Sequence, residues 1–166
     1  TLSEIWGRHF LDSAQIWNCR PPNAKRWLDM GSGGGFPGLV IAIIADELAP
    51  DLQVILVESD ARKASFLMKL CQETGIKATI HMERIENLSS QDADVISARA
   101  LAPTEKLLDY ASRHAREGAK LLFSKGANHE IELTEARKYW KFKLQKTTSL
   151  TDPSGVILEI EGLSRV

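Results

Sequence analysis

The sequence predicts an α/β fold in which a seven-stranded, mainly parallel sheet carries helices on both faces. Three observations lead to this prediction. Short β-like runs alternate with segments whose apolar residues recur at helical spacing, and a glycine-rich turn separates the first strand from the first helix. Only a hairpin-like loop separates the last two runs. Alternation of this kind indicates parallel strands, because each parallel crossover needs a covering element.

Seven β-like runs mark the expected strands. They are Arg26–Met30, Val54–Glu58, Lys77–His81, Asp94–Ala98, Lys120–Ser124, Phe142–Thr147 and Val156–Glu161. The loop between the last two contains Asp152, Pro153 and Gly155, which are typical of a turn. We therefore expect the last strand to run antiparallel to the one before it.

Four segments between these runs predict helices, and the pattern leaves room for another between the third and fourth strands. The four are Phe36–Leu48, Ala61–Thr74, Thr104–Arg116 and Glu130–Tyr139. Pro37 suits a first helical position and Gly75 suits a C-cap. Residues 1–20 predict an amphipathic helix against the sheet, with Trp6 and Trp17, three turns apart, as packing residues.

Composition bounds the class of protein. The 166 residues suffice for one domain, 1–166, with a sizeable core. The net charge of −1 does not indicate a nucleic-acid binder, so any RNA surface would be local. Cys19 and Cys71 form no CxxC motif, which predicts reduced, buried thiols in a cytoplasmic protein. The longest apolar run, Leu39–Ala45, is too short to span a membrane. Because Thr1 already lies in a helical pattern, we expect a further N-terminal piece upstream.

The glycine-rich turn "DMGSGGGFPG", residues 29–38, predicts a ligand pressed against bare backbone. It lies where an open α/β sheet binds ligands, at the carboxyl end of a strand and the N-terminus of a helix. Two templates fit. Gly33, Gly35 and Gly38 match the dinucleotide fingerprint G-x-G-x-x-G, which is weak evidence alone. Asp29, Gly31, Gly33 and Gly35 match the acid-x-Gly-x-Gly-x-Gly loop of S-adenosylmethionine-dependent methyltransferases.

An acidic residue at the end of the second strand helps to decide between the templates. Glu58 ends the run "VILVES", and a carboxylate there can accept both ribose hydroxyls of an adenosyl group. It also disfavours NADP, whose phosphate it would repel. Together with the glycine turn, Glu58 favours an adenosyl-containing cofactor.

At these residues the sequence resembles the RsmG family of 16S rRNA guanine-N7 methyltransferases, also called glucose-inhibited division protein B. The matching motifs follow in order over residues 8–126: "RHFLDS", "DMGSGGGFPG", "VESDARKASFL", "ERIE", "ISARALAP" and "LLFSKG". The resemblance implies a Rossmann-like, seven-stranded methyltransferase sheet with an antiparallel last strand. It also implies S-adenosylmethionine as cofactor and 16S rRNA of the 30S subunit as partner, methylated at N7 of guanine 527. We expect a monomer that needs neither membrane nor metal.

The family's cofactor contacts carry over where the motifs match. Gly31 and Phe36 occupy contact positions of the glycine loop, which Gly33 and Gly35 complete. Ile85 and Glu86 match the adenine-contacting pair, although family members usually have Ala before that Glu. Arg99 matches an arginine near both the cofactor and the target base.

The expected substrate pocket follows from the same motifs. Guanine N7 carries no proton, so the transfer needs no general base, and we expect positioning residues in place of a catalytic acid or base. Arg8, His9, Arg99 and Lys125 are the basic candidates, and Pro103 would shape the rim. Without a ligand, Arg8 and His9 would be a helix-face pair and Lys125 a solvated lysine.

Two other functions remain open from the residues alone. The fingerprint and a Tyr139-x-x-x-Lys143 spacing would suit an NAD-dependent oxidoreductase, although that pair falls across a predicted helix-to-strand break. A non-catalytic RNA-binding subunit could keep the fold without turnover. The segment "ARKYWKFKLQK", residues 136–146, has the basic and aromatic composition of an RNA-binding face, but also that of an amphipathic element facing core and water.

Overall fold

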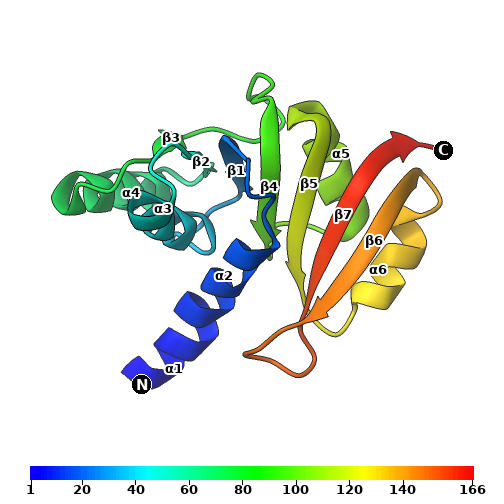
Figure 1. The fold of residues 1–166 in the computed structure, drawn as a ribbon, viewed down its shortest axis with the longest axis horizontal. Helices are drawn as coiled ribbons and strands as arrows, with labels where there is room; N and C mark the ends of the chain where they lie inside the picture. Colours follow the sequence, from blue (N-terminus) through cyan, green and yellow to red (C-terminus); the bar gives the residue numbers. More distant parts are fainter.

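The computed structural model describes all 166 residues and contains one seven-stranded sheet (Figure 1). The strands lie in the order β3-β2-β1-β4-β5-β7-β6. Their bounds are β1 Arg26–Met30, β2 Gln53–Val57, β3 Thr79–His81, β4 Ala93–Arg99, β5 Ala115–Lys125, β6 Trp140–Thr148 and β7 Val156–Arg165. The first five strands pair in parallel, and β7 runs antiparallel to both β5 and β6. The expected α/β class and the reversed last strand are therefore confirmed.

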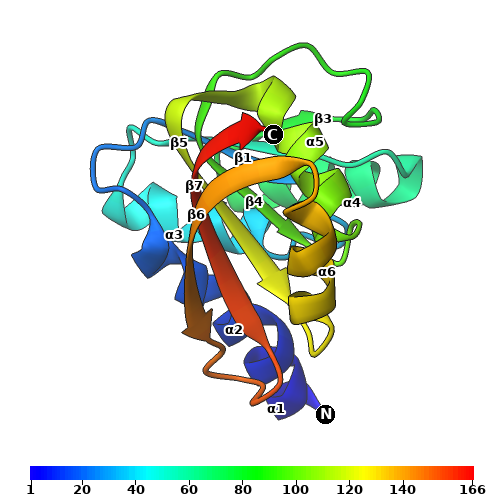
Figure 2. The same ribbon diagram turned by 90° about the vertical axis from the view of Figure 1, so that its right-hand side faces the viewer.

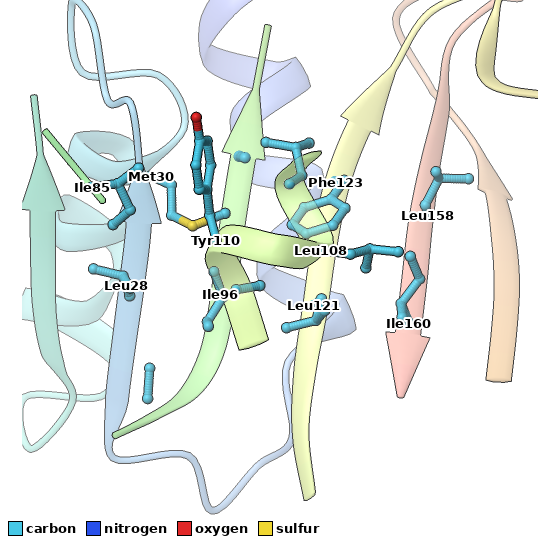
Figure 3. Packing of buried hydrophobic residues seen from close by; sticks show 14 of the residues in the cluster. Leu28, Met30, Ile85, Ile96, Leu108, Tyr110, Leu121, Phe123, Leu158 and Ile160 are labelled. Carbon is cyan, nitrogen blue, oxygen red and sulfur yellow. The ribbon is translucent and has the colours of Figure 1, made fainter. Parts of the chain in front are cut away.

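Helices cover both faces of the sheet, and each face has its own core (Figure 2). The helices are α3 Gly38–Leu48, α4 Ala61–Thr74, α5 Thr104–His114 and α6 His129–Ala136. The larger core lies under α5 and α6, where Met30, Ile96 and Phe123 of the sheet meet Leu108 of α5 (Figure 3). The second core lies under α3 and α4. No helix is long and apolar enough to cross a membrane.

Several boundaries differ from the sequence predictions. Helix α3 begins at Gly38, so Pro37 lies one position before the helix instead of at its first residue. Strand β5 begins at Ala115, directly after α5, because its pairing with β4 already starts there. Residues 82–92 join β3 to β4 without a helix. Gly75 is the left-handed C-cap of α4, as predicted.

The N-terminal helical segment packs on the sheet over only part of its length. It consists of α1 Leu2–Ile5, the π-helical η1 Trp6–Leu11, α2 Asp12–Ala14 and the 3₁₀-helical η2 Gln15–Cys19. Trp17 is 7% exposed and stacks parallel to Trp27 of β1, as expected of a packing residue. The same prediction for Trp6 is wrong: its side chain is 64% exposed and contacts only Phe10 among the aromatic rings, because this end of the segment projects from the sheet (Figure 1).

The two cysteines are not in a disulfide. Cys19 and Cys71 are half-buried, free thiols, whereas the sequence predicted buried ones. Burial raises the pKa of Cys19 to about 11, and the neighbouring Glu159 adds to that rise. Neither thiol lies in the glycine turn or beside it, so they have no part in the site described next.

Candidate functional site

The glycine turn leaves β1 in a conformation that needs glycine at alternate positions. Gly31, Gly33 and Gly35 have φ values of +67°, +57° and +106°. A Cβ on Gly31 would lie 2.7 Å from Cδ1 of Leu101, in the turn after β4. These are the three glycines of the acid-x-Gly-x-Gly-x-Gly template, and Gly31, which the dinucleotide fingerprint does not include, has a positive φ like the other two. The backbone therefore favours the methyltransferase template over the dinucleotide fingerprint.

Asp29 holds the glycine turn in place through buried hydrogen bonds. Its buried carboxylate accepts hydrogen bonds from Ser97 Oγ at 2.6 Å and from the Gly38 backbone N–H at 3.0 Å. Ser97 in turn accepts from Nε1 of Trp27 at 2.8 Å. Burial raises the pKa of Asp29 to about 6, although the bonds from Ser97 and Gly38 oppose the rise. The acid of the sequence template thus joins β1, β4 and the start of α3.

Glu58 lies at the tip of β2, beside the glycine turn. One carboxylate oxygen accepts from the Gly33 N–H at 2.7 Å and the other from the Asp60 N–H at 2.9 Å. Asp60 caps α4 through the N–H groups of Arg62 and Lys63. The Glu58 side chain is only 8% exposed, so its carboxylate is held in one place against the turn.

Ile85 and Glu86 lie beside a cavity of about 210 Å³ that Gly31 also lines. We call it the Gly31 cavity. The Ile85 side chain packs in the core near Met30 (Figure 3), while its carbonyl oxygen lies 3.1 Å from Nε2 of His114. Glu86 accepts from the Tyr110 hydroxyl at 2.9 Å. Hydrogen bonds from its own backbone and from Tyr110 hold the pKa of Glu86 below its usual value.

Two residues of α5 therefore position the Ile85–Glu86 turn, and sequence reasoning missed both. Tyr110 and His114 are four positions apart on one helix face, which brings both side chains to the same loop. That spacing inside a predicted helix was the available signal. The departure from Ala at Ile85 is accommodated because its side chain points into the core.

Arg99, the last residue of β4, meets the N-terminal helical segment. Its guanidinium donates to Asp12 Oδ2 at 3.3 Å and to the Arg8 carbonyl at 3.4 Å, and lies 3.2 Å from Nδ1 of His9. It also lies over the Phe36 ring at 5.4 Å. The structure thus brings together Arg8, His9, Phe36 and Arg99, which the sequence placed in separate motifs, and adds Asp12.

A second cavity, of about 530 Å³, opens beside Arg99 at the ends of β4 and β5. We call it the Arg99 cavity. Pro103 lines it at the N-cap of α5, and Lys125 lines it at the end of β5. Lys125 is not a solvated lysine: its side chain is 9% exposed and lies 2.7 Å from both Glu132 Oε2 and the Ala102 carbonyl oxygen.

The two cavities share a wall. Leu101 and Ala102, in the turn after β4, line both of them. Gly31 lines the first cavity and Arg99 lines the second. The turn after β4 therefore borders both cavities.

The segment 136–146 divides between core and solvent. Trp140 is buried and Phe142 half-buried, with Arg165 over the first ring at 3.9 Å and Arg137 over the second at 4.6 Å. Of the three aromatic residues in this segment, only Tyr139 is exposed. The amphipathic-element interpretation therefore accounts for most of the segment.

A family model described as "GidB: rRNA small subunit methyltransferase G" matches residues 1–157. The chain belongs to this family. It is 45% identical to ribosomal RNA small subunit methyltransferase G of Ruegeria sp. (strain TM1040) over 166 residues, which covers the whole chain and 80% of that relative. It is 47% identical to the protein of the same name from Ruegeria pomeroyi, again over the whole chain and 81% of that relative. The expected family and the methyltransferase class of enzyme are confirmed.

Solved structures agree on the fold of this methyltransferase family member. A SAM-dependent O-methyltransferase from Thermotoga maritima aligns with a TM-score of 0.69 at 14% identity, over 93% of this chain and 66% of that chain. M. jannaschii TYW2 in complex with AdoMet gives the same score at 12% identity, over 93% and 75%. The Tyr139-x-x-x-Lys143 spacing does not support an oxidoreductase, because the two residues do not share a helix. Tyr139 lies in the turn after α6 and Lys143 on β6.

Proposed function

We propose that this chain transfers the methyl group of S-adenosylmethionine to N7 of guanine 527 in 16S rRNA, acting as one methyltransferase domain, 1–166. The observation that carries the proposal is the pair of neighbouring cavities that share Leu101 and Ala102 as lining residues. One has the features of an adenosyl site and the other is large enough for a nucleobase. Membership of the rRNA small subunit methyltransferase G family supports the choice of RNA as substrate.

The residues around the Gly31 cavity fit the cofactor. The side-chain-free backbone at Gly31, Gly33 and Gly35 allows close approach of the methionine part. The Glu58 carboxylate can accept hydrogen bonds from ribose hydroxyls, either alongside its bond from the Gly33 N–H or in place of that bond. The Ile85 backbone and the Glu86 carboxylate would face the adenine edge. Family membership supports the same assignment.

The Arg99 cavity would take the target guanine. When bound, the sulfonium supplies an electrophilic methyl group: N7 forms the new N–C bond, the C–S bond breaks with its electrons going to sulfur, and the positive charge moves to the base. No proton is transferred, so the chain needs only to hold N7 in line with the methyl group and sulfur. The guanidinium of Arg99 has the geometry to donate to guanine O6.

The remaining predicted substrate residues would act at the rim of the Arg99 cavity. Arg8 is exposed and free to pair with a phosphate, and His9 lies beside both Arg99 and the Phe36 ring. Pro103 would shape the entrance. Lys125, held by Glu132 and a backbone carbonyl, would fix the far wall. Such a cavity requires the guanine to be unstacked before it enters.

The test is incubation with tritiated S-adenosylmethionine and 30S subunits from cells that lack the modification, followed by mass mapping of the labelled nucleotide. Label on N7 of one guanine of 16S rRNA is the expected result. Cofactor binding by calorimetry without label would instead favour a non-catalytic RNA-binding subunit. Tight NADH binding with no response to S-adenosylmethionine would contradict the proposal altogether.

A further inference from the structure

We propose that Asp12 is a positioning residue for methyl transfer, which orients Arg99 and neutralises its charge beside the target base. The inference rests on the proposed function and adds a residue to it. Asp12 lines the Arg99 cavity and makes an ion pair with Arg99 across 87 residues of sequence. Both side chains are mostly buried.

The two oxygens of Asp12 face different parts of the molecule. Oδ2 accepts from Arg99 at 3.3 Å. Oδ1 accepts from Gln15 Nε2 at 3.0 Å and from Thr151 Oγ1 at 2.8 Å, with Ser149 Oγ at 3.4 Å. The carboxylate is therefore held on one side by its own helix and by the β6–β7 loop. Its other oxygen is left for Arg99.

The β6–β7 loop is in turn held against the same helical segment. The Leu150 N–H donates to Gln15 Oε1 at 2.9 Å, and Ser149 Oγ lies 3.0 Å from Thr151 Oγ1. Both views of the ribbon show this loop beside the N-terminal segment (Figures 1 and 2). Asp12 thus lies where three distant pieces of chain meet, which is the arrangement needed to fix a long arginine side chain.

The chemistry gives this contact a purpose beyond stability. Transfer to N7 creates positive charge on the guanine, and an unpaired guanidinium nearby would oppose it. With Asp12 attached, Arg99 presents its remaining N–H donors as part of a neutral pair. The neighbouring His9 cannot supply a negative charge in place of Asp12, because an imidazole ring is either neutral or positively charged.

The test uses Asp12→Asn, Arg99→Gln and the double variant. Asn keeps an oxygen acceptor for Gln15 and Thr151, and on the side facing Arg99 it replaces the carboxylate oxygen with an NH2, which removes both the charge and the acceptor there. Asp12→Asn should lower kcat at least about tenfold, with the KM for S-adenosylmethionine changed less than about threefold. In the Arg99→Gln background it should change kcat less than about twofold, because its effect passes through Arg99. Equal losses in both backgrounds would overturn the proposal.

A binding measurement provides a readout that needs no turnover. Fluorescence anisotropy with a 16S rRNA fragment containing the target guanine should show tighter binding by Asp12→Asn, by about two- to fivefold, because the released Arg99 gains a phosphate partner. This gain should disappear when Arg99 is Gln. If Asp12→Asn caused a structural defect, it would instead weaken RNA binding with or without Arg99→Gln. That result, or an equal gain in affinity with and without Arg99→Gln, would contradict the positioning role of Asp12.

The control is Asp109→Asn, which removes the same charge from another Asp–Arg pair, the exposed one with Arg165. It should leave kcat unchanged, and a loss equal to that of Asp12→Asn would overturn the proposal. If Asp12→Asn lowers the melting temperature, the affinity cycle still tests the proposal. This cycle compares the RNA affinities of the folded wild type, the two single variants and the double variant. The two proposals fail separately: no label from the wild-type chain removes the proposed function, while the affinity cycle continues to test the coupling.

Discussion

The two halves of the site, around the Gly31 cavity and around the Arg99 cavity, are held in place by different kinds of contact. Around the glycine turn, backbone and buried carboxylates make contacts over 9 to 68 residues of sequence, from Asp29 to Gly38 and to Ser97. Beside the Arg99 cavity, the Asp12 carboxylate meets polar side chains 87 and 139 residues away, those of Arg99 and Thr151. The first half is therefore a rigid part of the sheet core. The second is a polar contact between elements that are distant in sequence.

If the Gly31 half is rigid, added volume there should have the largest effect. A Cβ on Gly38 would overlap Asp29 Oδ2 and Leu56 Cδ2 and would lie 2.7 Å from the Asp29 Cβ. Gly38→Ala should lower the free energy of unfolding by about 3 kcal/mol or more and abolish S-adenosylmethionine binding. Denaturant unfolding and calorimetry measure the two effects. Gly34→Ala is the matched control in the same turn, because nothing lies within 4 Å of its Cβ; equal effects would show that the turn is not packed as described.

The buried acid should make the same half sensitive to pH. Burial raises the folded pKa of Asp29 from 3.8 to about 6, so the folded state keeps the proton longer than the unfolded state. Its contribution to stability is present below about pH 4 and is lost as pH rises through 6, by roughly 2–3 kcal/mol. Denaturant unfolding from pH 4 to 7 should show Asp29→Asn gaining that much relative to wild type. A constant difference across the range would mean that Asp29 titrates normally.

Removing Glu58 tests whether the rigid half also binds the cofactor. Glu58→Ala should weaken S-adenosylmethionine binding by about 1–3 kcal/mol, because the ribose hydroxyls and the Gly33 N–H lose their acceptor. Calorimetry measures this, with the exposed Glu47→Ala on α3 as control. Affinity equal to that of wild type would mean that the ribose lies elsewhere.

The Arg99 half should respond in activity more than in stability. Arg99→Ala removes a partly exposed ion pair, while Asp12 keeps its other hydrogen bonds, so the free energy of unfolding should fall by about 1 kcal/mol or less. Turnover should fall at least about tenfold. Melting curves and labelling rates give the comparison. A collapse in melting temperature with normal specific activity would make Arg99 a structural residue.

The same contrast explains what the sequence could and could not predict. The order of strands and helices, the hairpin at the end and the alternate glycines of residues 31–35 follow from local patterns, and the fold confirms them. Trp6 was misjudged because helical periodicity does not say how far along a helix the sheet reaches. The partners of Lys125 were missed because Glu132 lies on another element, and nothing in the local sequence pairs them.

The missed site residues follow the same rule. The four-residue spacing of Tyr110 and His114 places both on one helix face. Their contact with residues 85–86 depends on how α5 packs across the sheet, which the spacing does not give. Asp12 lies within the "RHFLDS" motif, but the motif did not indicate its role, because its partners come from β4 and from the β6–β7 loop. Family motifs drew attention to Arg8, His9 and Arg99 separately, and only the tertiary structure shows them in one cluster.

The contact between Asp12 and the β6–β7 loop also bears on the order in which the molecule matures. The contact closes a loop of 139 residues, and it requires Thr151, which is translated after the whole glycine turn and after Arg99. The glycine turn, Glu58, Ile85 and Glu86 all precede residue 90, whereas Leu101, Ala102 and Tyr110, which also line the Gly31 cavity, follow it. A growing chain therefore contains every residue that lines the Gly31 cavity, the last of which is Tyr110, before it contains the Thr151 hydroxyl that holds Asp12.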